Sequence, residues 1–280
     1  MARTKKKKRD PRDTTMSLGD HLEELRARLI LAIIGLVMGS IICLIVGPYL
    51  IRFIELPYTN LKVKYGLDDL KVLAPADAVM AYMKISMIAG LILSSPWVFY
   101  QLWMFVAAGL FEHERRYVRM TVPFSVILFV TGAMFFLFVV APLSLAFFLK
   151  FGRFINVEPA WTLGLYVSFI TTLMLVFGLG FQTPIAMFIL NKTGLVSLGA
   201  LYKSRRYVLL GIFVVAAVAT PGPDVISQIT LAIPLYALFE LGILLSWLSE
   251  RKKMKKEKEK KKEKEKKKEK ESPPSQPEVY

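Results

Sequence analysis

The chain is poor in the side chains that most often bind metals. Its 280 residues include one cysteine, Cys43, and two histidines, His21 and His113. A single cysteine excludes an intrachain disulfide, and two histidines without a cysteine cluster make no credible zinc site. His113-Glu114 begins like the HExxH helix of zinc proteases, but Tyr117 stands where the second histidine is required. A metalloenzyme is therefore the weaker hypothesis.

Phosphate loops and catalytic nucleophile arrangements are missing as well. The sequence contains no GxxxxGKS or GxxxxGKT motif, which excludes nucleotide hydrolysis by that route. Serine, threonine and cysteine side chains lack a histidine base in a suitable place. We therefore expect a protein without covalent chemistry, without a cofactor and without a metal.

What the sequence does contain is long apolar runs. Hydrophobic residues make up 54% of the chain, and the mean hydropathy is +0.46. Runs of about 20 apolar residues match a hydrocarbon core about 30 Å thick. The runs are continuous rather than alternating, so they predict helices and not a β-barrel. The formal charge of +15 is concentrated in the two tails, which does not favour a nucleic-acid-binding fold.

We predict an all-α integral membrane protein with six transmembrane helices. Prolines at 96, 142 and 184 predict a kinked, curved bundle. The predicted fifth span has only about a dozen residues, which rise about 18 Å in a helix. We expect the fifth and sixth helices to be short. The predicted spans are Leu29–Val46, Ala78–Val106, Val122–Phe148, Leu163–Leu190, Val208–Ala219 and Ile226–Trp247.

Lysine and arginine in short loops predict the orientation. They are frequent in both tails, in Glu112–Arg119 and in Lys203–Arg206, which places both termini in the cytoplasm. The loop at 47–77 also carries cations and fits this topology least well. We divide the chain into a basic extension (1–16), a six-helix membrane domain (17–248) and a Lys/Glu-rich cytoplasmic tail (249–280). The tail is predicted to be disordered and to touch anionic lipid.

Carboxylates lie at the predicted cytoplasmic face. Glu24 lies in an amphipathic segment before the first span, and Glu114 lies between the second and third spans. A carboxylate recognises a guanidinium in a planar geometry with two hydrogen bonds, so two such sites would suit a pair of arginines. The alternative is that Glu114 only neutralises Arg115 or Arg116, and the residues alone do not decide between the two.

Two polar side chains fall inside apolar runs. Gln182 should face the bundle or a cavity, and such an amide is more often a contact between helices than a functional site. Glu240 should be protonated, paired with a partner or close to the membrane interface.

Several further motifs occur in a fixed order along the chain. They are His21-Leu22-x-Glu24-Leu25-Arg26-x-Arg28-Leu29, Leu93-Ser94-Ser95-Pro96, Tyr100-Gln101-Leu102-Trp103-x-Phe105, Leu110-x-x-x-Glu114-Arg115-Arg116, Phe177-Gly178-x-x-Phe181-x-x-Pro184, Arg205-Arg206-Tyr207-Val208, Thr220-Pro221-x-Pro223-Asp224-x-x-Ser227-Gln228 and Pro234-x-Tyr236-x-x-Phe239-Glu240. Together these motifs resemble the TatC family, the multispanning subunit of the twin-arginine protein translocase, and the resemblance covers about residues 17–248.

The resemblance implies a receptor and core subunit that binds the twin-arginine signal peptides of folded precursors. Transport would draw on the proton-motive force across the cell inner membrane. Partners would be single-span subunits of the TatA/TatB type, docked along the fifth and sixth helices, together with further copies of the chain and membrane lipid. Signal-peptide binding is assigned to Glu24, Glu114, Arg26 and Phe105, and translocation or assembly to Pro57, Gln182, Asp224 and Glu240.

Three positions depart from the family pattern. Ala108 precedes Gly109 where proline is expected, and Asp77 stands where glutamate is commoner. Gln182 replaces a glutamate of many members and cannot ionise, so no proton-linked role carries over to it. Two other classes remain as alternatives: a secondary transporter of small solutes, which should show an internal repeat and ionisable groups at mid-membrane, and a structural membrane scaffold.

Overall fold

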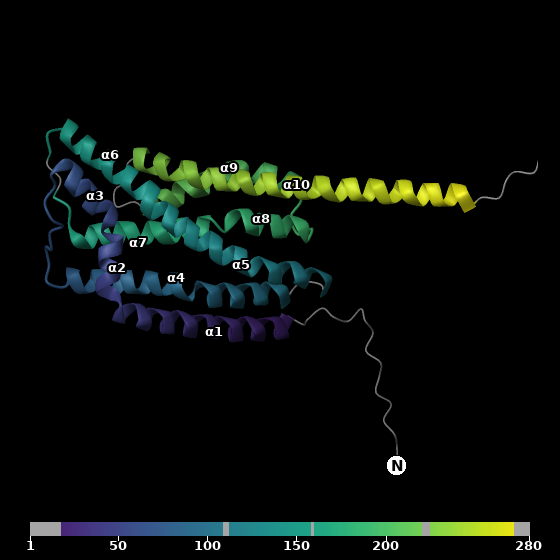
Figure 1. The fold of residues 1–280 in the computed structure, drawn as a ribbon, viewed down its shortest axis with the longest axis horizontal. Coiled ribbons are helices and arrows are strands. Elements are labelled where there is room, and N and C mark those ends of the chain that lie inside the picture. The colour runs from purple at the N-terminus through teal and green to yellow at the C-terminus, as the bar shows by residue number, and fades with distance from the viewer. Residues whose placement is uncertain (1–17, 109–111, 158–159, 220–224, 272–280) are drawn as a thin grey trace, which may run out of the picture.

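The computed structural model describes residues 18–108, 112–157, 160–219 and 225–271. The described residues are helical, apart from loops and one isolated bridge between Lys71 and Thr162, so the predicted all-α class is confirmed for them. Long helices lie side by side along one direction (Figure 1). The helices are α1 (Leu18–Ile45), α2 (Gly47–Ile54), α3 (Leu56–Tyr65), α4 (Asp77–Ala108), α5 (Glu112–Phe135), the π-helix η1 (Phe136–Val140), α6 (Ala141–Phe154), α7 (Leu163–Gly180), α8 (Thr183–Lys192), α9 (Leu198–Ala219) and α10 (Val225–Glu271).

Five helical stretches among the described residues are long and apolar enough to cross a membrane, which makes this a multi-pass membrane protein. They correspond to the predicted first, second, third, fourth and sixth spans. The predicted fifth span lies in α9, which is not among the five. Helix α9 has 22 residues because the basic segment before the apolar run is helical too. The five stretches are Leu22–Ile45, Asp77–Ala107, Met120–Phe154, Leu163–Lys192 and Gln228–Arg251.

The three prolines named in the sequence act differently in the fold. Helix α4 continues through Pro96. Pro142 lies in the first turn of α6, directly after the π-helix, and Pro184 lies in the first turn of α8. At Pro184 the proline costs no hydrogen bond within α8, because an amide in the first turn has no intrahelical partner. The bend at Pro184 therefore separates two helices, α7 and α8, instead of kinking one. Pro142 instead lies inside the continuous helical stretch Met120–Phe154, directly after the π-helix.

Helices α1 and α4 lie in unusually close contact. A Cβ atom on Gly39 would lie 2.7 Å from the carbonyl oxygen of Gly90, and one on Gly90 would lie 2.5 Å from the Cα atom of Ser40. Side chains at these positions would push the backbones apart. Near one end of the same contact, the Trp97 indole N–H donates to the carbonyl of Leu31 at 2.8 Å.

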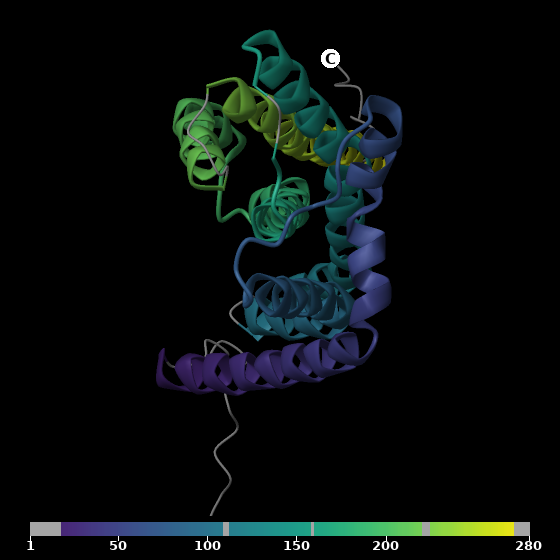
Figure 2. The same cartoon turned by 90° about the vertical axis from the view of Figure 1, so that its left-hand side faces the viewer.

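Figure 2 shows the bundle from one end, with α7 in the middle of a curved arrangement of helices and α1 at its margin. The residues of α7 that contact its neighbours are largely aromatic or branched. Phe177 is fully buried, and its ring centroid lies 5.3 Å from that of Phe136, which in turn packs against Phe169. Aromatic pairs at this spacing stabilise a core beyond the area they bury.

At the end of the bundle that carries α2 and α3, side chains tie the loops to the core. The buried Tyr166 hydroxyl donates to the carbonyl of Ile54 at 2.7 Å, and the Tyr58 hydroxyl donates to the carbonyl of Asp68 at 2.6 Å. Backbone hydrogen bonds at 2.9 and 3.0 Å join Lys71 to the segment that begins α7. Pro57 is buried in the first turn of α3, so it forms part of this fixed cap.

Glu55, between α2 and α3, gives the cap a pH dependence. Burial raises the pKa of Glu55, and the negative charge of Asp69 raises it further. A raised folded-state pKa means that the native protein holds the proton more tightly than the unfolded chain. The stabilisation that comes from protonated Glu55 is therefore complete below the ordinary pKa of 4.5, and it is lost as pH rises through the folded-state pKa.

We expect Glu55→Gln to raise the midpoint of thermal unfolding by about 1 °C at pH 7. At pH 4 the same substitution should leave the midpoint almost unchanged. Thermal unfolding in detergent across this pH range measures both. The control is Glu23→Gln, which changes an exposed carboxylate on α1. A variant that is less stable than the parent at pH 7 would contradict this account.

The Lys/Glu-rich segment differs from its predicted disorder, because α10 continues through it to Glu271. Lysine and glutamate are good helix formers, and pairs such as Glu263 and Lys267 stand four residues apart. The sixth predicted span and the tail are therefore one helix. The basic extension 1–16 lies outside the described residues.

Candidate functional site

A polar contact joins α1 to α4 near one end of the bundle. Arg28 donates through Nη1 to Oε1 of Gln101 at 3.0 Å and through Nη2 to Oε1 of Glu24 at 3.3 Å. Gln101 is only 2% exposed, whereas the Glu24 and Arg28 side chains are partly exposed. Glu24 thus presents a carboxylate at the protein surface that already accepts a guanidinium.

Helical spacing decides which predicted residues share this surface. Gln101 and Phe105 are four residues apart and project from the same face of α4, and Phe105 is half-buried. Arg26 is exposed and lies two residues from Glu24, so it projects from a different face of α1. The structure therefore groups Phe105 with the Glu24 contact and leaves Arg26 apart from it.

Glu114 belongs to α5, which begins at Glu112. The N-terminal ends of α1 and α5 and the C-terminal end of α4 lie at the same end of the bundle (Figure 1). The side chains of 112–119 are outside the described part of the structure, so the choice between recognition and a local ion pair stays open. Asp224 also lies outside the described residues.

Gln182 connects three helices. It occupies the N-cap position of α8, and its Nε2 donates to the carbonyl oxygen of Ser125 on α5 at 2.9 Å. The Ser125 hydroxyl in turn accepts the indole N–H of Trp103 on α4 at 2.7 Å. The Oε1 atom of Gln182 is buried and has no hydrogen-bond partner among the described residues. Gln182 therefore contacts neighbouring helices, as the sequence favoured, and retains one free acceptor.

Glu240 is paired, which is one of the three states expected for it. Its Oε2 accepts Arg205 Nη2 of α9 at 2.6 Å, and its Oε1 accepts the Tyr236 hydroxyl at 2.8 Å. The Arg205 guanidinium also lies over the ring of Tyr202, 4.9 Å from its centroid. The contact joins α9 to α10, so Glu240 holds the last two helices together.

The assigned residues divide between separate places in the bundle. Glu24 and Phe105 lie towards one end, and Pro57 lies in the cap with α2 and α3 at the other end (Figure 1). Sequence reasoning did not assign roles to Gln101, Arg28, Ser125 or Arg205. Gln101, Arg28 and Arg205 stand within the quoted motifs, and that is the indication the sequence offered for them.

No group of three or more metal-ligating side chains occurs in the described ranges. What the described residues do contain is polar and ionic contacts between apolar helices, with an accessible carboxylate near one end. The fold and this site define a multi-pass helical membrane protein. The chain belongs to the TatC family, since the family model for "Sec-independent protein translocase protein (TatC)" matches residues 20–234.

Individual relatives agree with the family match. The chain is 39% identical over 245 residues to the Sec-independent protein translocase protein TatC of Carboxydothermus hydrogenoformans, covering 88% of this chain and 98% of that protein. It is 36% identical over 239 residues to the TatC protein of Aquifex aeolicus, covering 85% and 98%. A crystal structure of the twin arginine translocase receptor TatC superposes with a TM-score of 0.74 at 35% identity, covering 81% of this chain and 98% of that one.

Proposed function

We propose that this chain is the receptor and core subunit of a twin-arginine translocase. It binds the twin-arginine signal peptides of folded precursors and organises their export, driven by the proton-motive force. The observation that carries the proposal is Glu24, an accessible carboxylate that accepts a guanidinium at 3.3 Å. A precursor arginine would make the same kind of contact, in competition with Arg28.

The proposed topology has six membrane helices in a cell inner membrane, with α9 as the fifth and with both termini in the cytoplasm. Family membership supports it, as do the basic segments at the N-terminal start of α9 and the C-terminal part of α10. Single-span subunits of the TatA/TatB type would dock along α9 and α10, where Glu240 holds the two helices together. Further copies of the chain would join the complex.

The proposal is tested by photo-crosslinking the reconstituted full chain to a twin-arginine signal peptide. The photoreactive residue replaces Tyr117, which stands three residues after Glu114 in α5. We expect crosslinking with the twin-arginine peptide and at least a tenfold loss both with a twin-lysine peptide and with Glu114→Ala, because lysine lacks the planar two-bond geometry.

A second photoreactive position provides the spatial control. Val63 is 84% exposed on α3, at the opposite end of the bundle, and should give no specific crosslink. Equal crosslinking with the twin-arginine peptide, the twin-lysine peptide and Glu114→Ala would remove Glu114 from the proposed site and favour the transporter or scaffold alternatives.

A further inference from the structure

Helix α10 reaches far beyond the membrane bundle. It is one continuous helix of 47 residues, and its apolar stretch ends at Arg251. Residues 252–271, which we call the charged rod, rise about 30 Å in a helix and extend past the ends of the other helices (Figure 1). Because the apolar part of α10 crosses the membrane, the same helix directs the charged rod away from the bilayer.

The charged rod has almost no apolar side chains. It contains 13 lysines and 6 glutamates, which give it a net charge of +7, and Met254 is its one other residue. A helix without an apolar seam does not form a coiled coil with a second copy of the chain. It also offers no aromatic or branched side chain as a buried anchor for a partner. Binding to the charged rod is therefore electrostatic, and its partner carries negative charge.

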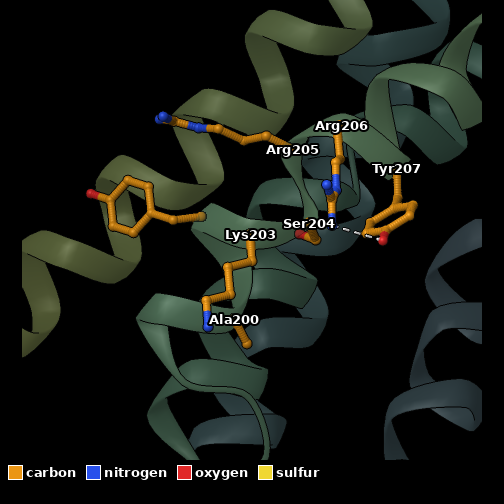
Figure 3. Close-up of a pocket in the computed structure, with 7 residues that line it drawn as sticks. Ala200, Lys203, Ser204, Arg205, Arg206 and Tyr207 are labelled. Carbon is orange, nitrogen blue, oxygen red and sulfur yellow. Dashed lines mark hydrogen bonds between the residues drawn. The ribbon is translucent and has the colours of Figure 1, made fainter.

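The described residues at the base of the charged rod do not supply that negative charge. Glu250 is the nearest carboxylate before the rod, and it faces the bundle, where it accepts the side-chain amide of Asn191 on α8 at 2.9 Å. Lys203 and Arg206 extend from α9 (Figure 3) and are exposed at the same end of the bundle. These cations repel the charged rod, so the rod remains available to a partner outside the chain.

The membrane surface is out of reach for most of the charged rod. Charges in physiological salt are screened over about 8 Å, whereas the far end of the rod stands about 30 Å beyond the apolar stretch. Glu24 and the N-terminal start of α5 lie at the same end of the bundle as the rod (Figure 1). Under the proposed function, a folded precursor held there by its signal peptide stands beside the charged rod.

We propose that the charged rod binds an acidic face of the folded precursor. This inference rests on the proposed function and deepens it, because it adds a contact that does not involve the signal peptide. Attraction between the rod and an acidic surface raises the association rate, and two linked contacts bind more tightly than either one alone. Acidic precursors are thereby favoured over basic precursors that carry the same signal peptide.

The test uses one twin-arginine signal peptide fused to two surface-charge variants of a single fluorescent protein, one strongly acidic and one strongly basic. Biolayer interferometry with the full chain in detergent measures both affinities. We expect the acidic fusion to bind about tenfold more tightly at low ionic strength. The difference should disappear at about 1 M salt, where screening acts over about 3 Å.

A variant of the full chain removes the charge of the rod and keeps its helix. Replacing the seven lysines from Lys258 to Lys267 with glutamine, which is also a good helix former, brings the net charge of the rod to zero. This variant should lose most of the preference for the acidic fusion and should bind the free signal peptide as the parent does. An unchanged preference would overturn the proposal. Circular dichroism checks that the helices remain folded.

The basic extension provides a matched control for net charge. Residues 1–16 also contain seven lysines and arginines, and they precede α1 at the same end of the bundle. Replacing all seven with glutamine makes the same change in net charge, and we expect this variant to keep the preference for the acidic fusion. An equal loss in both variants would assign the preference to overall charge and overturn the proposal.

The passenger alone separates this inference from the proposed function. The acidic fluorescent protein without a signal peptide should bind the parent weakly and should not bind the variant with the neutral rod. This comparison decides for or against the charged rod even if the free twin-arginine peptide fails to bind, a result that would contradict the proposed function instead.

A fluorophore on the rod tests the alternative that the rod lies on lipid. The dye is attached to Lys262→Cys in a Cys43→Ser background, about 16 Å along the helix from Arg251. In nanodiscs that contain phosphatidylglycerol spin-labelled on its headgroup, we expect no quenching of the dye. Strong quenching would place the charged rod on the membrane surface and overturn the proposal.

Discussion

Replacing Glu24 with glutamine should lower the affinity for a twin-arginine signal peptide by at least tenfold. A hydrogen bond to a charged group contributes about 1.5–3 kcal/mol, which corresponds to roughly 10- to 150-fold in affinity. Glutamine keeps the size of the side chain but removes the negative charge. Fluorescence polarisation with a labelled peptide and the full chain in detergent measures the change.

Glu23 provides the control, because it is a neighbouring carboxylate that is exposed on α1. Glu23→Gln makes the same charge change in the same helix, and we expect affinity within twofold of the parent. Losing the Glu24–Arg28 pair should itself cost little, since helical pairs four residues apart contribute about 0.3–0.5 kcal/mol and both side chains are partly exposed. Similar affinities for Glu24→Gln and Glu23→Gln would show that the contact with Arg28 is only structural.

The second large effect concerns the contact between α9 and α10. Glu240→Gln leaves the Arg205 guanidinium without its carboxylate, and removing one partner of a buried pair costs about 3–5 kcal/mol. The Arg205 and Glu240 side chains are 43% and 34% exposed, so solvent screening reduces the cost to about 1–2 kcal/mol. At roughly 2–4 °C per kcal/mol, the thermal midpoint should fall by about 2–8 °C.

A double-mutant cycle isolates this interaction. Arg205→Gln, Glu240→Gln should cost less than the sum of the single variants, because it leaves no unpaired charge. Glu259→Gln, on the exposed part of the same helix α10, should leave the midpoint unchanged. Strictly additive losses would mean that the 2.6 Å contact contributes no coupling energy.

Periodicity and length in the sequence predicted the apolar helices, because hydrophobic runs act locally. They could not predict where α9 begins, since Lys203, Arg205 and Arg206 are charged and yet lie within the helix. The sequence also did not predict that the Lys/Glu-rich tail is helical. Its composition suggested disorder, whereas lysine and glutamate are also strong helix formers, and α10 extends through it.

Side-chain partners were the least predictable part of the site. Glu240 could be recognised as needing a partner, but 35 residues separate it from Arg205. Gln101 and Arg28 are 73 residues apart, and only the packing of α1 against α4 brings them together. Such pairs depend on tertiary structure, and no local pattern specifies them.

The close contact between α1 and α4 has a consequence for ligand affinity. Gly39 and Gly90 allow the backbones of α1 and α4 to touch. The Trp97–Leu31 hydrogen bond joins the same two helices nearer to the contact of Arg28 with Glu24 and Gln101. Glu24 and Gln101 are therefore held at a fixed separation without any ligand. A preorganised site loses little conformational entropy on binding, so under the proposed function more of the energy of each arginine contact would remain available as affinity.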